Sequence, residues 1–299
     1  MQTLYSAQSI NNEVDAVEAL KNLRNNLAQS RQLFTYLVCF VIEIARYAET
    51  DSHQKSHKHL PSEHDLNINT KISGNDIVWT VSENPSFKTS LKEYKVESFL
   101  DKELIRRIYS SLVGSDDYKS YISIPQRDKK TEKRILEFIF NDLMLANQDF
   151  ISNVEEFFIH WDDDADMMVV LMASLFQQPS LFNFSDLVTP EKWDFAKTLL
   201  ETAIDKKEYC LNLIKPKLKN WDADRIASLD MILMQMGVCE FLYFETIPPK
   251  VSINEYIDLA KEYSTPQSGQ FVNGILDNIH KELTAENKIH KKNFKNSTL

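Results

Sequence analysis

Apolar residues recur every three or four positions through the last third of the chain, a spacing that an α-helix turns into one buried face. A first series consists of Ile253, Tyr256, Ile257 and Ala260, and a second consists of Phe271, Val272, Ile275, Leu276, Ile279 and Leu283. This pattern predicts two amphipathic helices, over about residues 252–262 and 267–283, that pack against other helices.

The chain between these series and the preceding helix carries its own helix signals. Pro248 and Pro249 prevent a preceding helix from continuing, because proline lacks an N–H and restricts the residue before it. Ser252 and Glu255 have the spacing of a capping box, in which each side chain accepts a backbone N–H at the start of a helix. We therefore expect a helix to begin at Ser252, after a sharp corner.

The same stretches carry a family resemblance. Residues 230–240, 247–255, 259–261 and 271–277 resemble, in this order and spacing, the C-terminal half of the NusB family of bacterial transcription antitermination factors. The resemblance covers about residues 186–284, and residues 2–6, Gln-Thr-Leu-Tyr-Ser, are similar to the end of the family's first motif.

The resemblance implies an all-α fold, a NusB-like helical bundle of two packed sub-bundles, here with an inserted loop and helical region. It implies a cytoplasmic, non-enzymatic factor without a cofactor. Such a factor pairs with the ribosomal protein NusE, binds boxA RNA, and helps RNA polymerase resist termination during ribosomal RNA synthesis. The resemblance leaves the oligomeric state open.

Relative to a minimal family member, the chain is expected to have three parts. Residues 1–48 form the N-terminal helices of the NusB-like unit, residues 49–180 an added region, and residues 181–299 the conserved helical part with a basic tail. Within the added region, residues 49–84 are rich in polar loop formers, which predicts an extended surface loop followed by further helices.

Composition limits the function. The formal net charge of −10 is unfavourable for a broad nucleic-acid surface, so any RNA contact must be local. The five glycines form no phosphate-binding loop. Cys39, Cys210 and Cys239 lie isolated in apolar helical patterns, which indicates reduced, buried thiols. The most apolar run, residues 33–45, is too short to cross a bilayer and predicts a buried helix.

The family's RNA surface combines the first helix with the start of the last conserved helix, which implies Tyr5, Gln267, Ser268 and Phe271 as RNA-binding candidates. An exposed Phe271 would stack on an unpaired base, whereas a buried Phe271 would be a core residue, and the sequence leaves both open. Lys215, Lys217 and Lys219 are the internal basic candidates: they contact phosphates, or they interact favourably with the end of the preceding helix.

Three further residues stand out in the conserved part. Asp230 and Glu240 interrupt an otherwise apolar helix, where they orient a basic partner protein or pair within the bundle. Gly274 weakens a helix interior, by about 1 kcal/mol relative to alanine, and is expected to allow a close helix approach.

Two clusters suggest metal sites, and neither has the required pattern. His53, His57, His59 and His64 lack the paired ligand couples of a closed zinc site, so a solvated segment is the better interpretation. Asp162, Asp163, Asp164 and Asp166 lack the glycine and glutamate of a calcium loop, and acidic residues at a helix start account for them. We therefore expect no metal.

The main departure from the family is at the start of the chain, which has no Lys or Arg before Lys21 and lacks the family's basic arm. We expect either that the natural chain begins upstream or that RNA affinity is reduced, and favour the first. Two alternative functions remain. One is a protein-interaction module with weak or no RNA binding. The other is an RNA-targeting helical domain related to that of ribosomal RNA cytosine methyltransferases, although no methyl-donor fold follows here.

Overall fold

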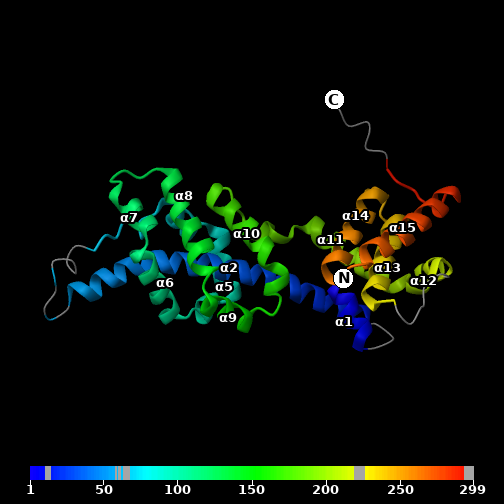
Figure 1. Cartoon of the computed structure of the whole chain (residues 1–299), viewed down its shortest axis with the longest axis horizontal. Coiled ribbons are helices and arrows are strands. Elements are labelled where there is room, and N and C mark those ends of the chain that lie inside the picture. The colour runs from blue at the N-terminus through cyan, green and yellow to red at the C-terminus, as the bar shows by residue number, and fades with distance from the viewer. Residues whose placement is uncertain (11–14, 58, 60–61, 63–67, 219–225, 293–299) are drawn as a thin grey trace, which may run out of the picture. The chain divides into compact units, whose positions relative to one another are not determined.

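The computed structural model describes residues 1–10, 15–57, 59, 62, 68–218 and 226–292 (Figure 1). Throughout this part of the chain the secondary structure is helical and contains no β-strand, which confirms the predicted all-α fold. The chain forms two compact units. Unit 1 comprises Met1–Asn25 and Pro190–Leu299, and unit 2 comprises Asn26–Thr189. The three-part division drawn from the sequence at residues 48 and 180 stays a prediction.

Unit 1 is built around a helix whose central part is enclosed, α13 (Ser228–Tyr243). Every residue from Ile232 to Phe241 is buried, as expected for a helix that is apolar on all sides. The helices that surround it are α1 (Gln2–Ile10), α11 (Pro190–Asp205), α12 (Lys207–Ile214), α14 (Pro249–Tyr263) and α15 (Ser268–Ala285). A short 3₁₀ turn, η4 (Lys215–Leu218), follows α12 and contacts α15.

The predicted capping box is wrong. Helix α14 begins at Pro249, not at Ser252, since a proline at the first helical position has its φ preset and needs no hydrogen bond for an N–H. Ser252 is thus inside the first turn, where it is buried. Glu255 is exposed and does not cap the helix.

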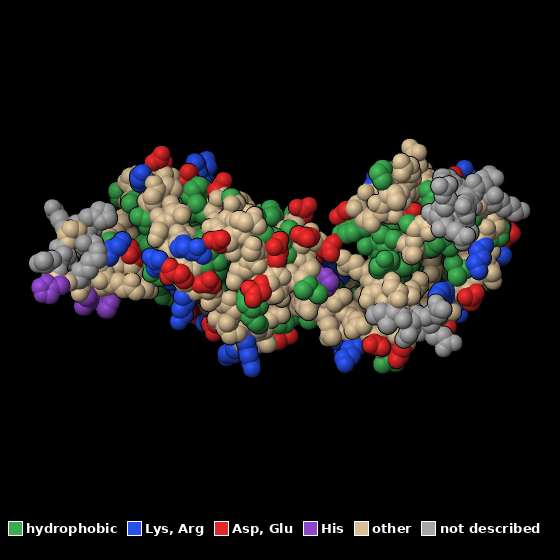
Figure 2. Space-filling view, turned by 60° about the horizontal axis from the view of Figure 1, so that its bottom comes forward, with side chains coloured by type: hydrophobic (Ala, Val, Ile, Leu, Met, Phe, Trp, Pro, Cys, Tyr) green, Lys and Arg blue, Asp and Glu red, His purple; other side chains and the backbone are tan. Residues whose placement is uncertain are grey.

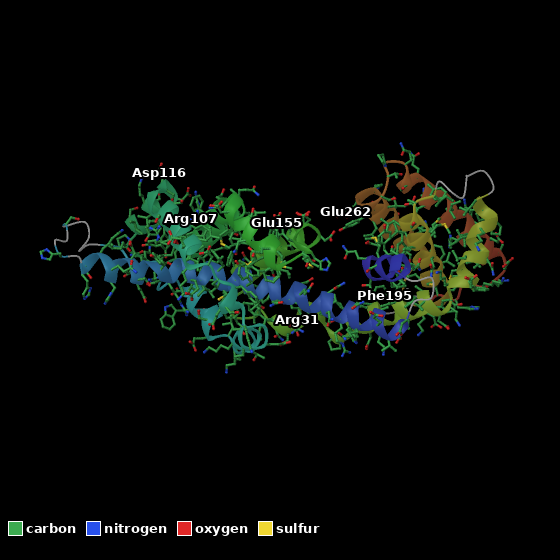
Figure 3. The ribbon with its side chains drawn as sticks, turned by 90° about the horizontal axis from the view of Figure 1, so that it is seen from below. Arg31, Arg107, Asp116, Glu155, Phe195 and Glu262 are labelled. Atoms are coloured by element: carbon green, nitrogen blue, oxygen red, sulfur yellow. The ribbon has the colours of Figure 1, made fainter. Side chains whose placement is uncertain are left out.

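Unit 2 contains most of the long helix α2 (Ala16–Ser56) and the following shorter elements. These are α4 (Asp76–Glu83), α5 (Pro85–Tyr94), η1 (Val96–Phe99), α6 (Lys102–Gly114), α7 (Asp116–Ser123), α8 (Lys129–Phe138), the π-helical η2 (Ile139–Met144), α9 (Gln148–Phe157), α10 (Trp161–Gln177) and η3 (Phe184–Val188). Some of these helices are joined by surface ion pairs. One forms between Arg107 of α6 (labelled in Figure 3) and Asp149 of α9, with Arg107 Nη1 2.7 Å from Asp149 Oδ2.

The core of unit 2 forms around α2. Residues 33–42 of this helix are all buried, which confirms the interpretation of the apolar run 33–45 as a buried helix. Phe34 packs against Phe184, and Phe40 against Phe150, with ring centroids 5.5 Å and 4.9 Å apart. Among the residues that the structure describes, no helix is long and apolar enough to span a membrane.

The prediction of an extended loop over residues 49–84 is wrong at both ends. Helix α2 continues to Ser56, and α4 begins at Asp76. Asn75 lies within the predicted loop, but its side chain accepts the backbone N–H groups of Ile77 and Val78 and so starts α4. His53 and His57 stack at the end of α2, and His64 lies outside the described residues. No group of three or more possible metal ligands is found in the described part of the chain.

The expectation that Gly274 allows a close helix contact is also wrong. A Cβ atom added at Gly274 would meet no atom within 4 Å. A close approach is found at Gly237 on α13, where a Cβ would come within 2.9 Å of the Leu276 side chain. Another is found at Gly269 on α15, where a Cβ would come within 2.8 Å of the Lys261 side chain.

We predict that Gly274→Ala stabilises the protein by about 0.5–1 kcal/mol, because alanine restricts the unfolded chain and fits the open position. Gly237→Val should destabilise it by about 1–3 kcal/mol, because the added methyl groups overpack a filled core. Urea denaturation measures both. A similar loss of stability in the two variants would contradict the assignment of the close contact.

Candidate nucleic-acid interface

A groove of about 470 Å³ opens in unit 1 between three segments. Its walls are the first turn of α1, the start of α13 and the turn that joins α14 to α15. The lining residues are Met1, Gln2, Tyr5, Ala227, Ser228, Leu229, Tyr263, Ser264 and Thr265. We call this the α1 groove. It brings the first helix, near residue 5, together with the approach to the last helix, near residue 265.

Hydrogen bonds from Ser268 hold the wall formed by the α14–α15 turn. The Ser268 hydroxyl donates to Asp230 Oδ2 on α13, at 2.7 Å, and accepts the backbone N–H of Thr265, at 3.2 Å. Ser268 and Asp230 are only 1% and 4% exposed. Both side chains therefore position the turn from beneath, and neither is open to a ligand in this structure. Asp230 Oδ1 is buried and has no hydrogen-bond partner in the described part of the chain.

Tyr5 is the candidate that the groove presents to solvent. Its side chain is 46% exposed and lines the groove directly. Gln267 is exposed at the N-cap of α15, two residues after Thr265. An exposed phenol ring next to exposed amide and hydroxyl groups can stack on a base and hydrogen-bond to its edges.

Phe271 packs in the core. Of the two interpretations that the sequence left open, an exposed stacking residue and a core residue, the structure thus has the core residue. It is 7% exposed and belongs to the apolar cluster of unit 1 together with Val272 and Ile275. It is one turn beyond Gln267, on the buried face of α15. Its ring is therefore not available for stacking in this structure.

Glu240 is buried between α13 and α14. Its carboxylate accepts the hydroxyl of Ser252, at 2.5 Å, and that of Tyr256, at 2.6 Å. Burial, and then the nearby Glu240 charge, hold the pKa of Tyr256 well above its ordinary value, so the phenol keeps its proton and donates. Glu240 thus pairs within the bundle, which was one of its two interpretations from the sequence. Asp230 is also hydrogen-bonded inside the bundle.

The structure does not bring the lysines to the α1 groove. Lys215 is exposed at the C-cap of α12, and Lys217 forms an ion pair with Glu282. Glu282 is fourteen residues beyond Ser268 on α15, about 21 Å along the helix at the usual rise of about 1.5 Å per residue. Lys219 lies outside the described residues.

Several groove residues were not identified from the sequence. Ser228 and Ser264 line the groove, and neither was singled out from the sequence. The signal that was available is the Ser264-Thr265-Pro266 turn directly before the conserved helix.

The cysteines are buried as predicted, and two of them meet. The Sγ atoms of Cys210 and Cys239 lie 3.5 Å apart as free thiols on α12 and α13. Burial also raises the pKa of Cys39 to about 12, which keeps this thiol protonated.

The α1 groove is weakly charged. Among the described residues, no Lys, Arg, Asp or Glu side chain lines it. On the face that Figure 2 shows, Lys and Arg side chains are mixed with Asp and Glu, without a broad basic area. RNA binding in the α1 groove would depend on stacking and hydrogen bonds more than on the neutralisation of phosphates.

Comparison with known proteins adds to this geometry. The model of the NusB family matches residues 171–281. A similar relative is the transcription antitermination protein NusB of Methylacidiphilum infernorum, 34% identical over 139 residues, which cover 46% of this chain and 93% of the relative. That of Salinibacter ruber is 41% identical over 102 residues, 34% of this chain and 64% of the relative.

The NusB protein of Finegoldia magna is 44% identical over 88 residues, 29% of this chain and 64% of the relative. The chain thus spans slightly less than two thirds of the length of the Salinibacter and Finegoldia relatives. No solved structure matches the chain significantly.

We predict that Glu240→Ala destabilises the protein by about 2–4 kcal/mol, because two buried hydroxyls lose their acceptor. Glu240→Gln, which keeps one acceptor oxygen, should have a smaller effect. The control is the exposed Glu255→Ala, with a change of at most about 0.5 kcal/mol. Chemical denaturation measures the free energy of unfolding of the three variants. A larger loss of stability in Glu255→Ala than in Glu240→Ala would restore the capping-box interpretation.

Proposed function

The chain belongs to the NusB family, with a further region N-terminal to the matched residues, and we propose that it is an RNA-binding transcription antitermination factor. The observation that carries the proposal is the α1 groove, where an exposed tyrosine faces the turn before the last conserved helix. This role is one of binding, without a chemical step.

We further propose, from the family resemblance, that the RNA is a boxA sequence and the protein partner the ribosomal protein NusE. Together they would join the antitermination complex on RNA polymerase during ribosomal RNA synthesis, in the cytoplasm. The relatives' shared name, transcription antitermination protein, supports the general role.

In this proposal an unpaired base stacks on Tyr5. The hydroxyls of Ser228, Ser264 and Thr265, which line the groove, and the exposed amide of Gln267, two residues further on, can hydrogen-bond the base edges or the sugar. The Ser268–Asp230 hydrogen bond supports the site by holding the turn in place. Lys215 and Lys217 remain candidates for a separate phosphate contact.

One observation favours a second candidate function. Since none of the described residues that line the α1 groove has a cationic side chain, its affinity for RNA alone should be modest, and a protein-interaction module with weak or no RNA binding also fits. Measuring RNA binding with and without NusE separates the two, because the second function predicts weak or no RNA binding in either case.

We predict that Tyr5→Ala weakens the binding of a boxA-containing single-stranded RNA about 10-fold, as expected when one base loses its stacking partner. Fluorescence anisotropy of the labelled RNA, at fixed salt, measures the change. Tyr209→Ala is the matched control, since this tyrosine is 41% exposed in the same unit but is not in the groove. Equal affinities of the Tyr5 and Tyr209 variants would contradict the proposed site.

A further inference from the structure

A second groove, of about 660 Å³, lies in unit 2, most of which precedes the residues that match the NusB family. It lies between α4, the start of α8 and the segment that follows α10. Lys129, Lys130 and Lys133 line it, with Asp76 on α4 and Leu181 on the opposite wall. We call it the lysine groove.

The lysine groove is positive in an acidic chain. Residues 127–134, Arg-Asp-Lys-Lys-Thr-Glu-Lys-Arg, include five basic and two acidic side chains, and Glu132 is buried against Arg127. Lys129 and Lys130 are exposed, and neither has an ion-pair partner in the part of the chain that the structure describes. Two ammonium groups are thus left open to a ligand.

The position of these lysines is unfavourable for the helix itself. Lys129, Lys130 and Lys133 occupy the first five residues of α8, at the positive end of its dipole, where cations destabilise a helix. Their charges add to that of the helix end, so the local potential attracts an anion. Asp128 caps this end through the backbone N–H of Lys130 and offsets only part of the charge.

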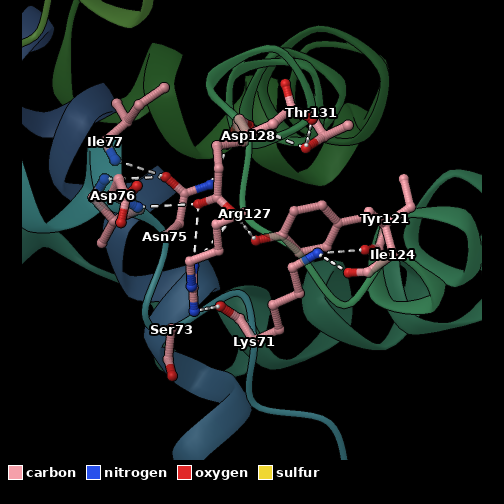
Figure 4. Close-up of polar contacts among 12 residues, drawn as sticks. Lys71, Ser73, Asn75, Asp76, Ile77, Tyr121, Ile124, Arg127, Asp128 and Thr131 are labelled. Carbon is pink, nitrogen blue, oxygen red and sulfur yellow. Dashed lines mark hydrogen bonds and ion pairs between the residues drawn. The ribbon is translucent and has the colours of Figure 1, made fainter.

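The two helical walls of the groove are held together before any ligand binds (Figure 4). Glu132 of α8 accepts the backbone N–H of Asp76 through Oε2, at 3.0 Å, and its backbone carbonyl accepts Asn75 Nδ2, at 2.9 Å. Arg127 and Tyr121 satisfy the rest of the Glu132 carboxylate. A groove with fixed walls binds at a lower entropic cost.

Two large apolar side chains near the groove are open to solvent. Leu181 is 77% exposed and lines the groove directly. Trp79 is 60% exposed on α4, three residues after Asp76, so the two are neighbours on the helix surface. Trp79 does not line the groove itself, but Thr80, the next residue, does. An exposed indole and a cationic groove can together hold a base and its phosphates.

We propose that the lysine groove binds single-stranded RNA, with phosphates on Lys129 and Lys130 and a base on Trp79. The inference rests on the proposed function for the choice of RNA as the ligand, and adds a contact in a different unit. An acidic peptide would also use the lysines, but it has no need of an exposed indole.

The first test measures the affinity of the full chain for a labelled oligouridylate by anisotropy, over a range of salt concentrations. Lys129→Gln with Lys130→Gln should weaken binding about 10-fold and reduce the salt slope by about 1.4, at about 0.7 for each lost phosphate contact. The matched control is Lys92→Gln with Lys102→Gln, which removes the same charge from exposed lysines outside the groove. Equal losses in both double variants would overturn the proposal.

Two single variants test the rest of the site. Trp79→Ala should weaken binding at least about fivefold with little change in the salt slope, because stacking releases no counterion. Asp76→Asn should tighten binding about twofold, since it removes the carboxylate that repels phosphates. Circular dichroism checks that each variant is folded. If Trp79→Ala binds like the unmodified chain and poly-glutamate displaces the RNA, the groove is an acidic-peptide site and the proposal fails.

Cross-linking separates this site from the α1 groove. RNA carrying 4-thiouridine should cross-link to peptides of residues 76–83 or 178–181, and this signal should be lost in the double lysine variant. Cross-links near Tyr5 should persist in that variant. Cross-links near Tyr5 alone would overturn the lysine groove and leave the proposed function intact. Cross-links at residues 76–83 alone would overturn the α1 groove, which carries the proposed function, and support the lysine groove.

Discussion

Unit 1 depends on the burial of residues 232–241 of α13 and on two buried carboxylates of this helix. Near one end of the helix, Asp230 accepts Ser268 at the start of α15, and near the other, Glu240 accepts Ser252 and Tyr256 of α14. A buried carboxylate without partners is costly, so these hydrogen bonds set where α14 and α15 lie against α13. The α14–α15 turn, and with it one wall of the α1 groove, takes its position from this arrangement.

Within the residues that resemble the family, those that hold the helices together differ from those that are open to a ligand. Within the motifs that resemble the family, Ser252 and Glu240 are buried and hold helices together. What is left for a ligand is small and nearly uncharged: Tyr5, the hydroxyls of the turn, and Gln267. A site of this kind selects by stacking and hydrogen bonding, and gains little from long-range attraction.

In unit 2, too, a buried carboxylate joins two helices, and here a positive groove lies beside them. A buried carboxylate, Glu132, again joins two helices, here α8 and α4, through Arg127, Tyr121 and the backbone of Asp76. Because Glu132 takes Arg127 as its partner, the neighbouring Lys129 and Lys130 remain unpaired. The same hydrogen bonds that stabilise the helix pair thus leave a positive groove beside it.

The sequence by itself determined the all-α fold, the buried run of α2 and the family, because helical periodicity and motif order are local properties of the chain. It did not determine which side chain meets which neighbour. The tertiary structure decided that Ser252 bonds to Glu240 instead of capping α14, that Phe271 is in the core, and that Gly237, not Gly274, makes the close contact. Each of these depends on how far a helix is rotated and where it is placed against a partner remote in sequence, and neither is encoded in residue spacing along one helix.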